Sequence, residues 1–351
     1  MGARALASLI VATSLFQAQA RTRPAPQPLP IIDMHVHAMV TPRPVEIATC
    51  TGDQTIVYLP IDPVTSPPDA PTMQCPRPIY STTRKAEFQR QTIAALRKAN
   101  VVRAVLIGQP AELASWRKTT PHLFIPASVP RGRSAADLDE LRASVLAGAV
   151  SIFGEFNAQY LGLGADDPMF EPFWALAESL DVPVGVHLGE SVQQVGQELV
   201  AMRYKAALTS PFQLEGVIKR HPKIRIYAMH AGSPMTDEMI TMLFTYPSLY
   251  VDISANDWNM PRAQFYGQLR RLVEAGFSKR IMFGSDQTIF PQAIEIAVRT
   301  IEQAPFLTPV QKRDILYNNA ARFLRLTPAE IASDYGASKV QQKRAAPKPR
   351  P

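Results

Sequence analysis

Charged residues and cysteines are scarce in this sequence of 351 residues. Only 19% of the residues are charged, against 46% hydrophobic, and two are cysteine. The low charge and high apolar content exclude an intrinsically disordered chain, and two cysteines are too few for a disulfide-dense scaffold. Cys50 and Cys75 lie 25 positions apart, which excludes a CxxC metal or redox site.

The signature motifs of several enzyme classes are also missing. The chain has no Gly-x-Ser-x-Gly, which excludes the usual nucleophile turn of serine hydrolases, and it has neither HExxH nor a Walker motif. Gly162-Leu163-Gly164 lacks the third glycine of a dinucleotide-binding turn. Because no apolar run approaches 18 residues after the N-terminal one, we expect no membrane span.

The formal net charge of +7 comes from the two ends of the chain. Arg4, Arg21 and Arg23 precede residue 31, and five Lys or Arg residues without any acid lie in 339–351, so residues 31–338 carry a net charge of −1. Such a nearly neutral body lacks the basic surface that binds a phosphate backbone. Nucleic acid is therefore not expected as a partner.

Both ends have sequence patterns that set them apart from the body. Residues 1–20 are typical of a secretory signal peptide, with a basic start, a short apolar run and a small-x-small cleavage site at Ala18-Gln19-Ala20. A proline-rich leader follows at 21–30. We therefore expect an exported protein, periplasmic or secreted. Residues 339–351 are basic and proline-rich, and we expect them to form a disordered tail.

Within the body of the chain, residues 31–338, short apolar runs alternate with amphipathic segments from Ile31 to about Leu326, which is typical of repeated βα units. Eight runs in about 300 residues predict a (β/α)8 TIM barrel, with an open doubly wound sheet as the alternative. The runs are 31–37, 101–108, 122–129, 149–156, 182–188, 224–230, 249–254 and 280–286, and the main helical segments are 82–99, 135–147, 171–180, 212–220, 236–244, 262–275 and 292–304.

Residues 38–80 interrupt this alternation with nine prolines and both cysteines. We interpret them as a long insertion after the first strand, at the end of the barrel where substrate pockets lie. In an oxidising compartment Cys50 and Cys75 are expected to form a disulfide that closes this loop, with a free pair as the alternative.

Four of the six histidines lie at the ends of predicted strands: His35, His37, His187 and His230. Residues two apart on a strand point to the same side, so His35 and His37 can bind one cation. Two carboxylates, Glu155 and Asp286, end other strands on the same side. Imidazole and carboxylate ligands without thiolates favour an open, catalytic site for zinc or a similar divalent ion.

The ordered motifs resemble the metal-dependent amidohydrolase superfamily, in particular the amidohydrolase-related group that includes aminocarboxymuconate semialdehyde decarboxylase-like enzymes. The resemblance covers about residues 31–326. The motifs that carry it are Asp33-Met34-His35-Val36-His37, Val186-His187-Leu188-Gly189, Met229-His230-Ala231-Gly232, Phe283-Gly284-Ser285-Asp286, and the closing helix at 315–324.

The resemblance implies that His35, His37 and Asp286 bind a first metal. His187 and His230 then either bind a second metal or divide into a ligand and a catalytic residue. Many members with two metals carry a bridging carboxylated lysine on the fourth strand, where this sequence has Glu155. Glu155 is expected to bridge or adjoin the metals, with contact to substrate or water as the alternative. One or two ions are thus expected in each chain.

The expected reaction is hydrolysis of an amide, ester or lactone bond in a small molecule by a metal-activated water, with Asp286 as the group that moves the proton. Decarboxylation of an aromatic or unsaturated carboxylic acid is the alternative, and a non-catalytic binding barrel is the least favoured. The sequence leaves the oligomeric state open, so a homo-oligomer is compatible with it.

Four further residues that follow predicted strands are candidates for contact with substrate: Tyr160, Glu190, Arg203 and Trp258. For each of them, a loop residue that satisfies backbone groups is an equally good interpretation. His122 precedes its strand and His221 ends a helix, so we expect both at the opposite end of the barrel, away from catalysis.

Overall fold

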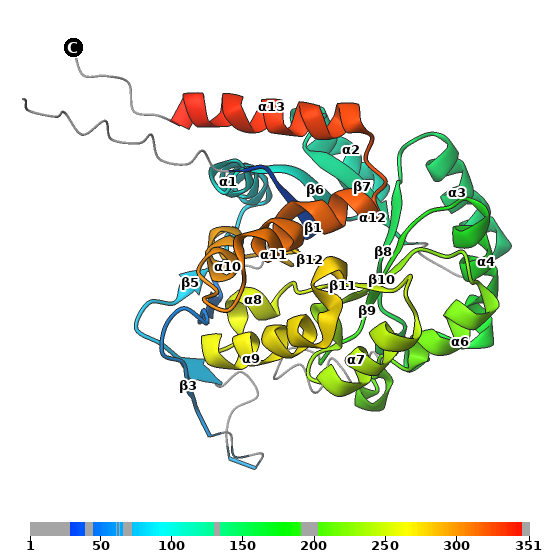
Figure 1. Cartoon of the computed structure of the whole chain (residues 1–351), viewed down its shortest axis with the longest axis horizontal. Coiled ribbons are helices and arrows are strands. Elements are labelled where there is room, and N and C mark those ends of the chain that lie inside the picture. Colours follow the sequence, from blue (N-terminus) through cyan, green and yellow to red (C-terminus); the bar gives the residue numbers. More distant parts are fainter. Residues whose placement is uncertain are drawn as a thin grey trace, which may run out of the picture.

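A computed structural model of the chain describes residues 29–38, 45–60, 62, 64–65, 72–129, 134–190 and 203–345. Eight parallel strands form one sheet in chain order, surrounded by helices (Figure 1), so the predicted TIM barrel is confirmed. The strands are β1 (Ile31–His37), β6 (Val101–Ile107), β7 (Phe124–Ser128), β8 (Ile152–Phe156), β9 (Val184–His187), β10 (Ile226–Met229), β11 (Tyr250–Asp252) and β12 (Ile281–Met282).

The helices between the strands follow the predicted amphipathic segments closely. Two helices between the strands were not predicted: α2, on which only Leu113 and Trp116 are buried and the periodicity is therefore weak, and α8, which is only four residues long. The α-helices are α1 (Lys85–Lys98), α2 (Pro110–Thr119), α3 (Ala135–Leu146), α4 (Glu171–Ser179), α6 (Gln213–Arg220), α7 (Thr236–Thr245), α8 (Asn256–Asn259), α9 (Arg262–Leu272), α10 (Ala293–Glu302), α11 (Pro309–Arg313), α12 (Asn319–Phe323) and α13 (Pro328–Ala345).

Backbone hydrogen bonds between β1 and the chain after β12 close the sheet into a barrel. The Asp286 N–H donates to the His35 carbonyl at 2.7 Å, and the His37 N–H donates to the Gln287 carbonyl at 3.1 Å. Residues 283–287 therefore extend the eighth strand along β1, although the regular ladder ends at Met282. This closure holds Asp286 beside the two histidines of β1.

Gly284 is required for that close approach. A Cβ atom at this position would lie 3.0 Å from the Cβ of His35 and 3.1 Å from the Cβ of Ser254. Contacts this short are tighter than most real Cβ contacts, so a larger residue would displace His35 or Ser254 by a few tenths of an ångström, and glycine lets three strand ends approach without that displacement.

Two groups of buried apolar side chains form the core. The larger lies between the strands and the surrounding helices and includes Trp116, Phe153 and Trp174. The smaller draws from strands on all sides of the barrel and from α12, and includes Ile32, Tyr227, Met229 and Met282. Side chains from strands that are not neighbours can meet only inside the barrel, so this group fills the interior below the strand ends.

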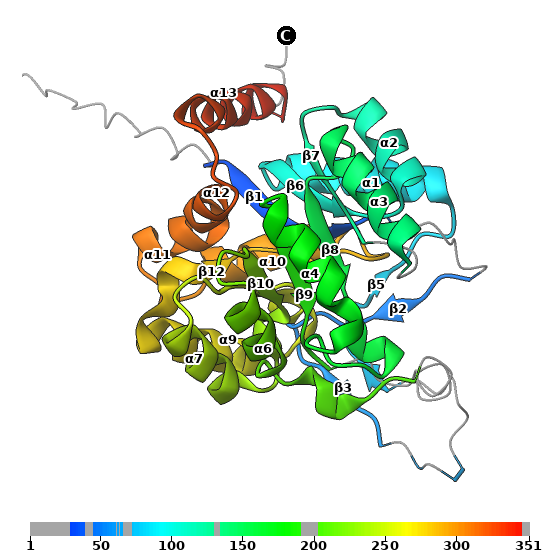
Figure 2. The ribbon, with the colours of Figure 1, turned by 90° about the vertical axis from the view of Figure 1, so that its right-hand side faces the viewer.

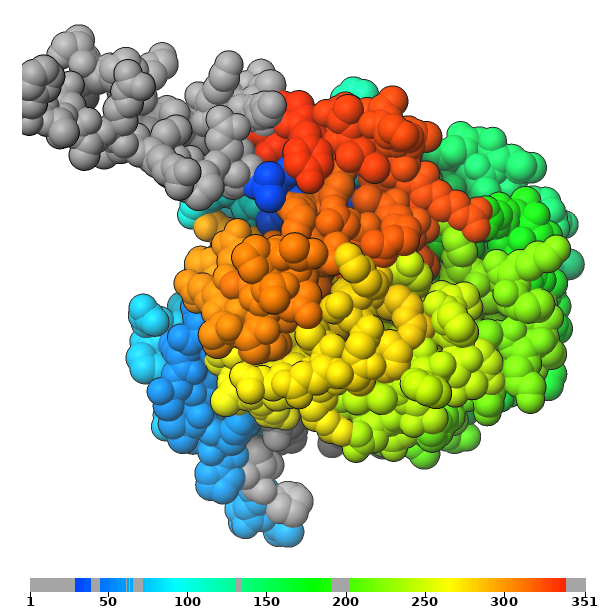
Figure 3. All heavy atoms as spheres, viewed as in Figure 1, coloured from blue at the N-terminus to red at the C-terminus, as the bar shows by residue number. Residues whose placement is uncertain are grey.

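The segment after β1 forms two short antiparallel pairs. β2 (Ala48–Thr49) pairs with β5 (Ile79–Tyr80), and β3 (Val57–Tyr58) pairs with β4 (Met73–Gln74). Cys50 and Cys75 form the predicted disulfide. Figures 2 and 3 show this segment, in blue, extending from the body of the barrel at the end opposite α13.

α13 lies at the other end of the barrel, beyond α12 (Figure 1). It continues to Ala345, which corrects the predicted start of the disordered tail at residue 339. The physical reason is that 339–345 contains no proline and consists mainly of good helix formers, whereas the next proline is Pro347. Residues 346–351 lie outside the described residues.

The predicted signal peptide and most of the leader also lie outside the described residues. Within the described ranges, no helix is long and apolar enough to cross a membrane.

A buried ion pair attaches α13 to the barrel. The Arg103 Nε donates to both carboxylate oxygens of Asp334, at 2.9 and 2.8 Å, and the Tyr317 hydroxyl donates to Asp334 at 2.8 Å. Asp334 is 5% exposed. Its removal leaves the phenol without its acceptor and the guanidinium with only the partly exposed Glu330, whose Oε1 lies 3.9 Å from Arg103.

We therefore expect Asp334→Ala to lower the free energy of unfolding by about 3 kcal/mol in urea titrations. The exposed Asp139 of α3 provides the control, since Asp139→Ala should change it by less than about 0.5 kcal/mol. Equal effects of the two substitutions would contradict the anchoring role of Asp334.

Candidate metal centre

The four predicted histidines meet at the C-terminal end of the barrel. The Nε2 atoms of His35 and His37 lie 3.1 Å apart, and His187 Nδ1 lies 3.1 Å from His230 Nε2. His35 and His37 belong to β1, His187 ends β9, and His230 directly follows β10. The structure thus brings the histidines together as two neighbouring pairs.

The two predicted carboxylates lie against these pairs, and Glu155 contacts both of them. Asp286 Oδ1 lies 3.0 Å from His37 Nε2 and 3.4 Å from His35 Nε2. Glu155 points one oxygen toward each pair: Oε2 lies 3.5 Å from His37 Nε2, whereas Oε1 contacts His187 Nδ1 and lies 3.5 Å from His230 Nε2.

The donor atoms fit divalent cations. His35, His37 and Asp286 offer one set of converging ligand atoms, and Glu155, His187 and His230 offer another. Imidazole nitrogens only 3.1 Å apart need a cation or a proton between them, and the buried Asp286 Oδ1 has no hydrogen-bond partner among the described residues. Nitrogen and carboxylate ligands suit zinc, manganese and similar ions.

The carboxylates also determine the protonation of the cluster. Burial alone would lower the pKa of His35, but Asp286, Asp252 and Glu155 outweigh it and raise that pKa well above 6.5. Burial would raise the pKa of Glu155, but His187 and its neighbours hold it well below the usual value. Without metal, protons on the histidines therefore balance the carboxylate charge.

Three polar residues that were not predicted support the ligands. Asp33 accepts the N–H groups of His35 and Ser285, at 3.0 and 2.9 Å, and so ties β1 to the chain that carries Asp286. Burial raises the pKa of Asp33 to about 7. Asp252 and Ser254, at the end of β11, contact His35. The signal that could have found them is the polar pattern at the ends of the first and seventh apolar runs.

Two further buried polar side chains, Asp257 and Gln287, lie close in the sequence to Ser254 and Asp286. Among the described residues, both carboxylate oxygens of Asp257 and both amide atoms of Gln287 have no hydrogen-bond partner. Burial, together with the nearby Asp33 and Asp252, raises the pKa of Asp257 well above its usual value.

The predicted substrate-contacting residues occupy different environments. Tyr160 packs edge-on against His187, with ring centroids 5.4 Å apart, and the Glu190 carboxylate lies close enough to His230 to interact with it electrostatically, so the structure brings both beside the cluster. Glu190 and Arg203 are exposed. Trp258 is 5% exposed and donates its indole N–H to the Ser285 carbonyl at 2.7 Å. Trp258 therefore supports the chain that carries Asp286, and contact of all four with substrate stays a prediction.

The insertion is attached next to Trp258. The Gly52 N–H donates to the Trp258 carbonyl at 2.6 Å, and its own carbonyl accepts the Arg262 N–H at 3.1 Å. A Cβ atom at position 52 would lie 1.8 Å from the Met260 carbonyl oxygen, so this contact requires glycine. The insertion thus reaches the end of the barrel where the cluster lies.

The two remaining histidines have other surroundings. His221 ends α6 and lies 2.9 Å from Glu171 and 3.3 Å from Glu178, two carboxylates of α4. His122 is exposed and precedes β7. Both precede strands, so they lie at the end of the barrel opposite the cluster, as predicted.

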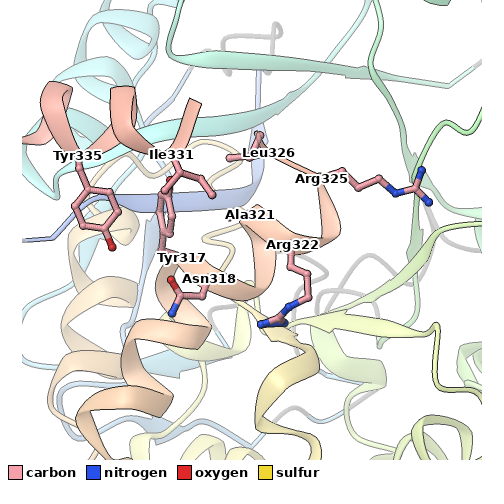
Figure 4. A pocket seen from close by; sticks show the side chains of 8 residues that line it. All are labelled: Tyr317, Asn318, Ala321, Arg322, Arg325, Leu326, Ile331 and Tyr335. Carbon is pink, nitrogen blue, oxygen red and sulfur yellow. The ribbon is translucent and has the colours of Figure 1, made fainter. Parts of the chain in front are cut away.

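A pocket of about 490 Å³ lies far from the cluster, between α12 and α13 (Figure 4). Tyr317 and Tyr335 line it together with two arginines, Arg322 and Arg325. Arg322 donates to the Lys279 carbonyl at 3.0 Å and Arg325 pairs with Asp181, so these cations already have partners. The reactive groups lie at the opposite end of the barrel, and we place the functional site there.

Metal uptake should release protons, because a cation must displace those held on His35 and His230, whose pKa values are both raised. In the metal-free protein, the protonated histidines stabilise the fold at low pH, and this contribution is lost as pH rises through the raised pKa. The increase in Tm on adding metal should therefore grow as the pH rises above about 6.5, the ordinary pKa of histidine. Calorimetric titration in two buffers measures the released protons, and uptake without proton release would contradict this account of the charges.

Comparisons with known proteins identify the family and the fold. A family model described as amidohydrolase matches residues 32–326. No curated protein gives a significant sequence match. Among solved structures, the chain resembles three TIM barrels at 15–16% identity, which shows a shared fold.

The first is a probable 2-pyrone-4,6-dicarboxylic acid hydrolase from Acinetobacter baumannii with citric acid bound, at 16% identity (84% of this chain, 99% of that chain, TM-score 0.54). The second is a 2,6-dihydroxybenzoate decarboxylase from Rhizobium, at 16% identity (86% and 99%, TM-score 0.53). The third is a dihydroxybenzoic acid decarboxylase from a Polaromonas species with bound manganese, at 15% identity (70% and 91%, TM-score 0.52). Since the family model matches nearly the whole barrel, the chain belongs to the amidohydrolase family.

Proposed function

We propose that the protein is a metal-dependent hydrolase that uses two divalent ions to cleave an amide, ester or lactone bond in a small molecule. The observation that carries this proposal is Glu155. Its two oxygens face different histidine pairs, His35 and His37 on one side and His187 and His230 on the other. A carboxylate in this position is suited to bridge two cations.

When bound, such ions polarise a carbonyl oxygen and lower the pKa of water toward neutrality. His35, His37 and Asp286 would hold one ion, and His187 and His230 the other, with Glu155 shared. Zinc is the first candidate because nitrogen ligands dominate, and manganese is the second.

Asp286 is the residue proposed to move the proton. Its Oδ1 is buried and has no hydrogen-bond donor among the described residues, so it can accept a proton from the attacking water and pass it to the leaving group. The nearby His35 and His37 hold the pKa of Asp286 below its usual value, against the effect of burial, so its carboxylate is ionised at neutral pH. His230 lies across the cluster and would orient the scissile carbonyl if it does not serve as a ligand.

Decarboxylation is the second candidate, because the decarboxylases among the structural neighbours are as similar to this chain as the pyrone hydrolase. The number of metal ions bound per chain distinguishes the two proposed reactions. Two tightly bound ions with Glu155 as a ligand favour hydrolysis, whereas a single ion favours decarboxylation.

We also propose that the protein acts after export, in the periplasm or outside the cell. The signal-like pattern of residues 1–20 and the Cys50–Cys75 disulfide support this location, since disulfides persist in oxidising compartments.

Replacing the shared carboxylate tests the two-ion proposal. We expect the wild-type protein to retain two ions per chain after dialysis, and Glu155→Gln to retain one at most, as measured by elemental analysis. Glu140→Gln, on the surface of α3, is the matched control and should retain two. Two retained ions in Glu155→Gln would show that Glu155 is not shared.

Asp286→Asn tests the proton transfer. We expect metal to remain bound while kcat falls by about 10²- to 10⁴-fold, the usual range for a lost general base. The assay is a panel of lactones, esters and N-acyl compounds, with carboxylated phenols included for decarboxylation. Unchanged turnover in Asp286→Asn would remove it from the role of base.

A further inference from the structure

A single hydroxyl group contacts one histidine from each pair of the cluster. Ser254 Oγ lies 2.9 Å from His35 Nδ1 and 3.2 Å from His230 Nδ1. The same oxygen lies 2.6 Å from Asp252 Oδ1. Ser254 and Asp252 are both 0% exposed, so water does not compete for these bonds.

The hydrogen-bonding capacity of the hydroxyl determines the direction of each bond. Asp252 Oδ1 already accepts the backbone N–H groups of His230, at 2.9 Å, and Ser254, at 3.1 Å, so it acts as an acceptor. The single Ser254 proton therefore points to Asp252. The two remaining lone pairs of Oγ can only accept, and the donors are His35 Nδ1–H and His230 Nδ1–H.

Two other acceptors require the same tautomers. The Ser254 carbonyl, which cannot donate, lies 3.2 Å from His230 Nδ1. Asp252 Oδ2 lies 3.3 Å from His35 Nδ1. A proton on each Nδ1 leaves the lone pair on Nε2, and it is Nε2 of both rings that faces Glu155.

We propose that Ser254, held by Asp252, is the positioning residue of both metal sites: it fixes His35 and His230 as Nδ1–H tautomers and aims each Nε2 at its ion. This inference rests on the proposed two-ion function and adds a physical link between the ions. Because one oxygen orients a ligand of each ion, its loss should weaken both sites together.

The packing around Ser254 makes this link rigid. A Cβ atom at Gly284 would lie 3.0 Å from the Cβ of His35 and 3.1 Å from the Cβ of Ser254, so any side chain there would have to displace its neighbours by a few tenths of an ångström. The His35 and His230 rings are 5.3 Å apart, centroid to centroid. These close contacts restrict the positions from which Ser254 reaches both rings.

The direct test reads the tautomers in the wild-type protein, without any substitution. Long-range ¹H–¹⁵N correlation spectra of the zinc-loaded protein should show Nδ1–H for His35 and His230. An Nε2–H tautomer at either residue would overturn the proposal. If the wild type binds no zinc, the proposed function fails, and the same spectra of metal-free protein at alkaline pH still decide the tautomers.

The second test measures both zinc dissociation constants by competition with a chelator. In Ser254→Ala both should rise by about 10- to 100-fold, the usual cost of losing a partner that orients a metal ligand. Ser128→Ala removes a buried hydroxyl at the end of β7, which contacts only the Val129 carbonyl at 3.4 Å among the described residues, and should leave both constants unchanged. A change in neither constant, or in one alone, would overturn the shared role of Ser254.

Discussion

Several carboxylates lie together at one end of the barrel, and the arrangement of the site follows from the need to balance their negative charge. Glu155, Asp286, Asp252 and Asp33 lie there in buried or nearly buried positions, and the ion pairs that the described residues form with them involve histidines alone. Unpaired carboxylates in such an environment are costly. Protons on the histidines can balance this charge. Divalent cations would balance it as well, and they would also use the converging lone pairs of the histidine nitrogens and carboxylate oxygens. The site is thus arranged for cations before any substrate arrives.

The barrel provides the rigidity that this arrangement needs. Parallel strands place their C-terminal ends side by side, so ligands from β1, β8, β9, β10 and the chain after β12 converge without a loop having to position them. Gly284 allows the last of these segments to approach β1 and β11 closely, and Asp33 and Trp258 hold it there. The hydroxyl of Ser254 then sets the orientation of two rings at once. Backbone contacts at the strand ends thus fix the positions of the side chains that form the site.

Much of this site follows from the sequence because a strand end is easy to recognise when a histidine or an acid terminates an apolar run. That is why His35, His187, His230 and Asp286 could be predicted. Asp252 and Ser254 also end an apolar run, but their contact with His35 was not predicted because it depends on how closely the end of β11 approaches β1 in the folded barrel. The helix over 339–345 was not predicted because residues 339–351 as a whole are basic and proline-rich, although the first of these prolines is Pro347, beyond the helix.

The central claim is that Glu155 is shared by two cations. Anomalous diffraction from crystals of the zinc-loaded protein tests it most directly. The account predicts two peaks about 3.5 to 4 Å apart, one beside His35, His37 and Asp286 and one beside His187 and His230, with a Glu155 oxygen on each. A single peak, or two peaks without Glu155 between them, would contradict it.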